Sequence, residues 1–125
     1  MENALVPSKY IIDVQKENFK EEVIEFSENT PVVLLFQMDR LGICKQFYPN
    51  IEEAINNAQG AYRLAIIDTD KIGDDLKKEY EVKYIPMVRF VYKGVNLGGF
   101  DGWKSKTEVS DYCQKVLEYI KENCQ

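Results

Sequence analysis

The chain has 125 residues, of which 45% are hydrophobic and 30% charged, with a formal net charge of -5. This length favours a single domain over residues 1–125, and the composition is that of a globular protein rather than a disordered one. The acidic charge argues against nucleic acid or an anionic membrane as a partner, and no apolar run is long enough to span a membrane.

Histidine is absent, and the three cysteines are widely spaced. Without histidine, the usual activation of Ser or Cys nucleophiles and the commonest zinc ligand are both missing, so we expect no hydrolase, no metal site and no cofactor. Cys44, Cys113 and Cys124 form an odd set without a short spacing, which suits reduced thiols. The start MENALVPSKY lacks the features of a signal peptide, so we expect a cytoplasmic protein.

The first part of the chain predicts a strand, a helix and a second strand. YIIDV at residues 10–14 is short, apolar and rich in β-branched side chains, which is typical of a strand. Residues 18–29 place apolar side chains close to one helical face, so we expect a helix that ends at Thr30 and Pro31. The continuous apolar run VVLLF at 32–36 predicts a strand buried on both faces.

A longer helix, a strand and a short helix are expected next. Apolar residues recur at spacings of three and four through residues 41–58, and Pro49 should kink this helix because proline lacks a backbone N–H. YRLAIID at 62–68 predicts a strand, and residues 72–80 predict a short helix. The alternation of strands and helices indicates an α/β sheet.

The pattern changes after Pro86. MVRFVY and VNLGGF flank the dipeptide Lys93-Gly94, which is typical of an antiparallel hairpin and makes the predicted sheet mixed. The last helix should begin at a capping box in which Ser105 is the N-cap and Glu108 reaches back to it.

This order of elements resembles the thioredoxin family over roughly residues 10–123. The segment VVLLFQMDRLGICKQFYP is similar to the family's buried strand, tryptophan, Cys-Gly-Pro-Cys-Lys active site and proline-kinked helix. Four of its residues fall in register with that motif, namely Gly42, Cys44, Lys45 and Pro49.

A second segment, EVKYIPMVRFVYKGVNLGGFDG, is similar to the part of the family in which a cis proline precedes a strand, a glycine turn and a closing glycine. Ile85-Pro86, Gly94 and Gly102 fill those positions. The resemblance implies a thioredoxin-like three-layer α/β sandwich, with a mixed central sheet flanked by helices and a cis bond before Pro86.

The departures from the family matter more for function. Leu41 occupies the position of the nucleophilic cysteine, Arg40 that of the tryptophan and Ile43 that of the proline, while Leu35 lies where a buried acid is common. Thiol-disulfide exchange needs an attacking thiolate and a second thiol to resolve the mixed disulfide. The resemblance therefore implies that dithiol exchange is lost.

Two interpretations of Cys44 stay open. It is either a lone redox thiol, able to form a mixed disulfide, or a buried helix residue, and the resemblance places it at the shielded resolving position, which favours burial. Cys113 lies on the apolar stripe of the last helix and is expected in the core. Cys124 is one residue from the end of the sequence and is expected to be exposed.

By the resemblance, Pro86 shapes a shallow groove whose backbone pairs with an extended peptide, a contact that needs no sulfur. The expected groove residues are Leu41, Gly42, Ile43, Ile85, Pro86 and Met87, with Met38 adding to an apolar, adaptable rim. Alternatively, Pro86 serves folding alone, and neighbouring side chains cover the apolar loop residues.

Three functions follow. The leading one is a monomeric protein- or peptide-binding, chaperone-like module without dithiol activity. The alternatives are a redox protein that uses Cys44 alone and a structural subunit of a larger assembly. We interpret Asp68 and Asp70 as a solvated turn with helix N-cap residues rather than as a metal site, and Trp103 as packing at the start of the last helix.

Overall fold

The structure is a computed structural model, and it describes residues 8–123. The strands are β1 (Ile11–Val14), β2 (Val32–Gln37), β3 (Arg63–Asp68), β4 (Met87–Tyr92) and β5 (Val95–Asp101). The helices are η1 (Lys16–Asn18), η2 (Lys20–Glu25), η3 (Phe26–Glu28), α1 (Gly42–Asn57), α2 (Asp74–Glu79) and α3 (Lys106–Asn123).

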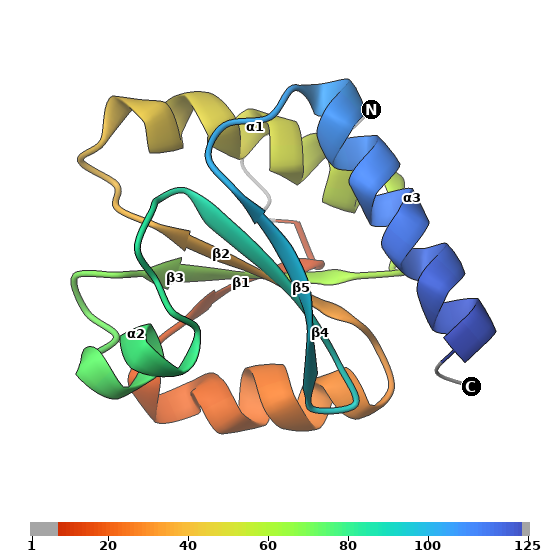
Figure 1. Cartoon of the computed structure of the whole chain (residues 1–125), viewed down its shortest axis with the longest axis horizontal. Coiled ribbons are helices and arrows are strands. Elements are labelled where there is room, and N and C mark those ends of the chain that lie inside the picture. The colour runs from red at the N-terminus through yellow and green to blue at the C-terminus, as the bar shows by residue number, and fades with distance from the viewer. Residues whose placement is uncertain (1–7, 124–125) are drawn as a thin grey trace.

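The five strands form one mixed sheet in the order β1-β3-β2-β4-β5 (Figure 1). β1 and β2 both run parallel to β3, whereas β4 is antiparallel to its neighbours β2 and β5. The carboxyl ends of the three parallel strands therefore lie at the same edge of the sheet. The predicted mixed α/β sheet is confirmed.

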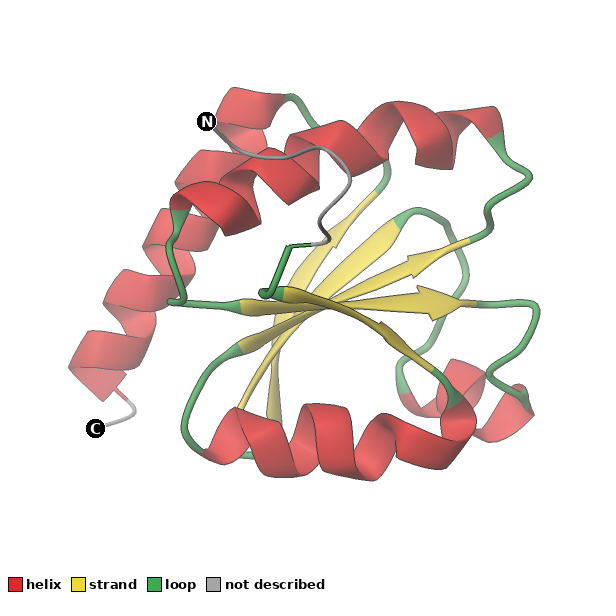
Figure 2. Cartoon of the chain, turned by 180° about the vertical axis from the view of Figure 1, so that it is seen from behind, coloured by secondary structure: helices red, strands yellow, loops and turns green. Residues whose placement is uncertain are grey.

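Helices cover both faces of the sheet, with α1 and α3 on one side and α2 and the N-terminal helical turns on the other (Figures 1 and 2). β2 is the central strand, and all six of its residues are buried. Val33 and Leu35 belong to the core beneath α1 and α3, whereas Val32, Leu34 and Phe36 belong to the core on the opposite face. This period-two alternation builds the three layers.

The helical region before β2 differs from the ordinary helix expected over residues 18–29. A π-helical segment, η2, lies between the 3-10 turns η1 and η3. The buried residues of the whole helical region before β2 occur at every fourth position and face the sheet; they are Phe19, Val23 and Ser27. The wider turn of a π-helix helps to keep such positions on one face, because an α-helix has only 3.6 residues per turn.

Ser27 ties this helical region to the turn between β4 and β5. Its hydroxyl accepts a hydrogen bond from the Gly94 N–H at 3.0 Å, and its carbonyl accepts one from the Lys93 N–H at 2.8 Å. Lys93 and Gly94 have φ values of 51° and 75°, as a two-residue hairpin of this type requires. The predicted hairpin is confirmed.

The predicted start of the last helix is also confirmed. The Glu108 N–H donates to the Ser105 hydroxyl at 3.2 Å, and the Ser105 N–H donates to the Glu108 carboxylate at 3.0 Å. Pro49 lies inside α1, which continues beyond it to Asn57. Within residues 8–123, no helix is both long and apolar enough to cross a membrane.

Candidate peptide groove and the cavity beside Cys44

The start of α1 carries the four residues L-G-I-C in two different environments. Leu41 is the N-cap, with extended backbone at φ -93° and ψ 127°, and it has no side-chain cap hydrogen bond. Gly42 and Ile43 are exposed, Ile43 to 44%. Cys44 is only 2% exposed, because it lies on the same helical face as the buried Phe47.

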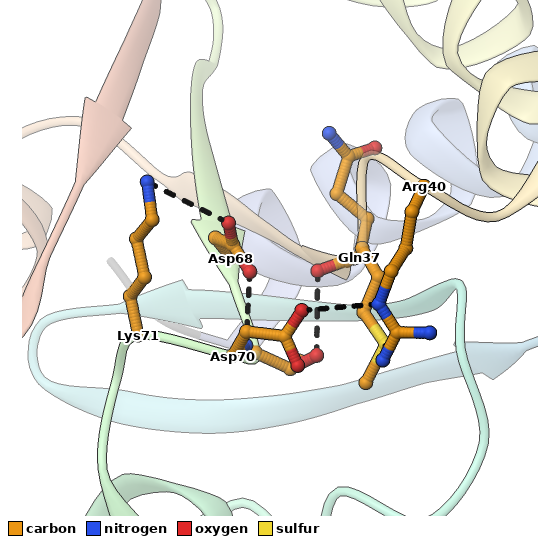
Figure 3. Close-up of polar contacts among 7 residues, drawn as sticks. Gln37, Arg40, Asp68, Asp70 and Lys71 are labelled. Carbon is orange, nitrogen blue, oxygen red and sulfur yellow. Dashed lines mark hydrogen bonds and ion pairs between the residues drawn. The ribbon is translucent and has the colours of Figure 1, made fainter.

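Arg40, which stands at the position of the family's tryptophan, makes polar contacts in place of an apolar cover. Its Nε lies 3.4 Å from the Asp70 carboxylate, and its guanidinium also reaches the Met38 sulfur at 3.2 Å (Figure 3). Both members of this ion pair are exposed, so it fixes the loop before α1 only weakly.

The Ile85–Pro86 peptide bond is cis. Pro86 is buried, and its carbonyl accepts a hydrogen bond from the Gly102 N–H at 2.8 Å. Ile85 is half-buried, and within residues 8–123 its backbone N–H and carbonyl have no hydrogen-bond partner. The backbone polar groups of Ile85 are thus not used within the described part of the chain.

Met87 does not line the groove, so that prediction is wrong. Met87 is 1% exposed and belongs to the core on the face covered by α2, together with Phe36 and Tyr80. It is the first residue of β4 and pairs with Phe36, so the alternation of the strand directs its side chain inward.

The sheet brings the other groove residues to one edge. Phe36 pairs with Met87, and Met87 pairs with Asp101, so the chain leaving β2, entering β4 and leaving β5 emerges side by side. Leu41, Gly42 and Ile43 follow β2, whereas Ile85 and Pro86 precede β4.

Two exposed aromatic residues lie at the same edge. Tyr84 is 68% exposed and comes two residues before Pro86. Trp103 follows Gly102 and is 49% exposed, so half of its surface is in solvent, although packing at the start of the last helix was expected. Sequence reasoning missed Tyr84, although the apolar loop sequence Tyr84-Ile85-Pro86 is a signal that could have indicated it.

By the resemblance, position 35 would hold a buried acid that supports sulfur chemistry, but apolar core packing takes its place here. Leu35 is fully buried among Phe47, Val88 and other apolar residues, and it offers no carboxylate near the start of α1. Cys113 is buried in the same core, where burial raises the pKa of its thiol to about 12. Cys124 lies outside the described residues, so the expectation of its exposure is untested.

A cavity of about 610 Å³ lies between α1 and the carboxyl ends of β1, β3 and β2. Its lining residues are Asp13, Val14, Gln15, Gln37, Asp39, Cys44, Lys45, Tyr48, Pro49, Ile66, Asp68 and Lys71. Burial, with the nearby Glu52 and Asp13 carboxylates, raises the pKa of Tyr48 to about 12. The sequence analysis did not find this cavity, because its lining comes from four separate segments.

The loop after β3 is a hydrogen-bonded turn (Figure 3). The Asp68 carboxylate accepts the Asp70 N–H at 2.9 Å and lies 3.9 Å from the Lys71 ammonium. Neither aspartate caps α2, so that prediction is wrong: the N-cap is Gly73, whose φ of 82° suits glycine. No group of three or more potential metal ligands occurs among residues 8–123.

A mixed five-stranded sheet between two helical layers, with a cis proline opposite the start of α1, defines the thioredoxin-like fold. The sequence pattern of thioredoxins matches residues 10–115. The chain belongs to the thioredoxin family.

Several proteins that are named as thioredoxins or a disulfide isomerase are similar to this chain in sequence. The chain is 33% identical over 101 residues to probable thioredoxin-2 of Caenorhabditis elegans, a match that covers 81% of this chain and 68% of that protein. It is 29% identical over 100 residues to the mitochondrial thioredoxin of Mus musculus, which covers 80% of this chain and 58% of the mouse protein. A protein disulfide-isomerase of Triticum aestivum is 26% identical over 105 residues, which is 84% of this chain and 20% of that protein.

Proposed function

We propose that this thioredoxin-family chain binds extended peptide segments of other proteins at the edge formed by Leu41, Gly42, Ile43, Ile85 and Pro86, without dithiol exchange. One observation carries this proposal: the first turn of α1 offers a leucine where an attacking thiol is needed, and the remaining thiol, Cys44, is 2% exposed. Exchange requires an accessible thiolate and a resolving partner, and this arrangement supplies neither.

Backbone geometry supports the peptide as ligand. An extended segment can pair with the free N–H and carbonyl of Ile85, as in strand addition, where main-chain hydrogen bonds give affinity and side-chain contacts give specificity. Ile43, Tyr84 and Trp103 provide exposed apolar area beside that backbone, and aromatic residues are enriched where proteins bind proteins.

Panning a library of extended peptides against the wild-type protein in reducing buffer tests the proposal. Binders are then measured by calorimetry against Ile43→Ser and the matched control Val95→Ser, which removes an exposed aliphatic side chain at the start of β5. We expect Ile43→Ser to weaken binding roughly fivefold, from the loss of partly buried apolar area, and Val95→Ser to leave it unchanged. Equal effects of both variants, or no binders at all, would contradict the proposal.

A second candidate function is single-thiol redox chemistry at Cys44, which the redox names of the relatives favour. In that reaction the Cys44 thiolate attacks one sulfur of a disulfide such as oxidised glutathione, a mixed disulfide forms, and one thiol leaves. Mass spectrometry of the native protein after such treatment decides the matter, because rapid modification of Cys44 would favour this second function over the first.

We further propose that the protein acts as a monomer in the cytoplasm. Cys44 and Cys113 are free thiols in the structure, and reduced thiols suit a reducing compartment. Analytical ultracentrifugation in reducing buffer and imaging of the tagged protein test the two parts separately.

A further inference from the structure

The loop that joins β5 to α3 is held on both sides of one exposed aromatic residue. On one side, the Gly102 N–H donates to the Pro86 carbonyl at 2.8 Å. On the other side, the Asn50 side-chain amide donates to the Lys104 carbonyl at 2.8 Å, which joins the loop to α1 (Figure 1). Trp103 lies between these two hydrogen bonds and is 49% exposed. Its backbone is therefore tied to the cis-proline segment and to α1, while half of its surface is open to a partner.

Asn50 differs from the other buried residues of α1, which carry apolar side chains or a thiol, namely Cys44, Phe47, Ile51, Ala54 and Ile55. It is only 8% exposed, and a buried amide costs free energy unless it is hydrogen-bonded. Its partner carbonyl lies 54 residues further along the chain. The helix that carries Ile43 in its first turn is thus joined directly to the loop of Trp103.

Trp103 lies beside the backbone that the proposed peptide would use. β4 and β5 pair in antiparallel register as far as Met87 and Asp101, and the hydrogen bond between Gly102 and the cis proline extends this pairing by one residue. The next position in the same register brings Trp103 next to Ile85, whose backbone N–H and carbonyl are not used within residues 8–123.

Lysines flank this aromatic residue. Lys83 is exposed and lies in the segment before the cis proline, whereas Lys104 directly follows Trp103. Among the described residues, neither lysine forms an ion pair. Asp101, the carboxylate closest to Trp103 in sequence, is 3.0 Å from the Arg89 guanidinium. The charge on both sides of Trp103 therefore favours a partner that carries carboxylates.

We propose that Trp103 is the specificity-determining residue of the peptide edge, where it selects acidic extended segments that carry an aromatic side chain, and that Asn50 is its positioning residue. This inference rests on the proposed function. Arg40 occupies the position of the family's tryptophan, so Trp103 supplies the chain's single tryptophan from a different loop. Aromatic pairs contribute more than their buried area, and an anchor that is fixed before binding loses little conformational entropy.

The test uses the acetylated and amidated peptide Thr-Glu-Val-Phe-Val-Asp-Thr, in which β-branched residues favour an extended chain and Glu, Phe and Asp share one face. Two matched peptides replace Phe by Ala, or both acids by Lys. Trp103 emission reports this loop alone, whereas the amide NMR shifts of Ile43 and Ile85 report the peptide edge independently. We expect the first peptide to move the emission to shorter wavelength and to shift both amides, and each matched peptide to bind about tenfold more weakly.

Variants then assign the roles. Trp103→Ala should weaken the Phe peptide about tenfold and leave the Ala peptide unchanged, because only the Phe peptide has the aromatic partner. Tyr119→Ala, which removes a 51% exposed aromatic residue from α3, is the matched control and should change neither affinity. Asn50→Ala should weaken the Phe peptide about threefold, speed the anisotropy decay of Trp103 in the free protein, and have no further effect on affinity in the Trp103→Ala variant.

The inference is overturned if the first peptide does not bind up to about 5 mM, if the three peptides bind equally, or if Trp103→Ala acts equally on the Phe and Ala peptides. An Asn50→Ala effect on affinity that persists without Trp103, or an unchanged anisotropy decay, overturns the role of Asn50. Peptide binding that shifts the Ile43 and Ile85 amides but is insensitive to Trp103→Ala overturns this inference and leaves the peptide edge intact. Absence of any binder in the panned library overturns the peptide edge itself.

Discussion

Buried thiols are the clearest chemical feature at the scale of single residues. Cys44 and Cys113 are 2% and 5% exposed, and burial raises the pKa of the Cys113 thiol to about 12. Since the thiolate is the reactive form, a buried neutral thiol reacts slowly. Because burial raises its pKa, the Cys113 thiol also makes the free energy of unfolding depend on pH under alkaline conditions.

We predict that replacing Cys113 by valine makes stability less sensitive to alkaline pH. In the unfolded chain the thiol ionises above about pH 8.5, whereas in the folded protein it stays neutral to about pH 12. The contribution of Cys113 is therefore complete below about pH 8.5 and falls as the pH rises, by about 1.4 kcal/mol per unit. Urea unfolding at pH 7 to 10.5 measures the difference from wild type, and a difference independent of pH would contradict the prediction.

Glycine positions give a second test at this scale. A Cβ on Gly99 would clash with backbone atoms of Val88 and Arg89 on the neighbouring strand, whereas a Cβ on Gly42 would meet nothing within 4 Å. We expect Gly99→Ala to destabilise the protein by more than about 2 kcal/mol, because backbone must move. Gly42→Ala should stabilise it by about 0.5 kcal/mol, because alanine is the better helix former. Thermal unfolding compares the two, and similar melting temperatures would contradict the assigned strand pairing.

At the scale of elements, two hydrogen bonds to Ser27 join η3 to the β4–β5 hairpin, and one of them uses the Ser27 hydroxyl. Ser27 is fully buried, accepts the Gly94 N–H and donates to the Ile24 carbonyl at 2.7 Å. We expect Ser27→Ala to cost about 1–3 kcal/mol, because the Gly94 donor loses its partner. Ser110→Ala, at an exposed position of α3, should change stability by less than about 0.5 kcal/mol. Equal effects in chemical denaturation would show that the hairpin does not depend on Ser27.

Elements that are fixed by residues close together in the sequence were predictable, whereas features that depend on contacts with distant parts of the chain were not. The Lys93-Gly94 turn and the Ser105–Glu108 capping box depend on residues within four positions of each other, and both are confirmed. The π-helical segment η2 escaped prediction, because its hydrogen-bond pattern depends on how it lies against the sheet. The inward side chain of Met87 escaped for a similar reason, since only its pairing with Phe36 sets which face it takes.

At the scale of the whole molecule, one sheet edge supports two different surfaces. Segments that follow β2 and precede β4 form the proposed peptide edge, whereas residues at the ends of β1, β3 and β2 line the cavity under α1. The residues of the first surface were proposed from sequence because they lie in family motifs along the chain, and its peptide-binding role stays a prediction. The second surface could not be predicted, because Asp13, Gln37 and Cys44 meet only when the parallel strands are aligned.

Restoring a thiol at position 41 tests whether the missing cysteine alone prevents dithiol exchange on this fold. In Leu41→Cys, a thiol would stand at the N-cap of α1, three residues before Cys44, whose N–H already donates to the Leu41 carbonyl at 3.1 Å. We expect the two thiols to form an intramolecular disulfide under mild oxidation, because the helix N-terminus favours a thiolate. Mass spectrometry of the oxidised variant checks this, and failure to form the disulfide would contradict the assignment of Leu41 to the nucleophile position.

Turnover should nevertheless stay poor in Leu41→Cys, because the fully buried Leu35 gives no carboxylate to accept a proton from Cys44. Adding Leu35→Asp should raise the rate of disulfide reduction, although burying a carboxylate in this apolar core should cost several kcal/mol. Leu34→Asp is the matched control: Leu34 is equally buried but belongs to the core on the opposite face, so it should destabilise the fold without raising the rate. Both double variants are assayed at low temperature, where the folded fraction is confirmed by circular dichroism. A rate increase in both double variants, or full activity in Leu41→Cys alone, would show that the rate of disulfide reduction is limited by the missing cysteine and not by the missing buried carboxylate at position 35.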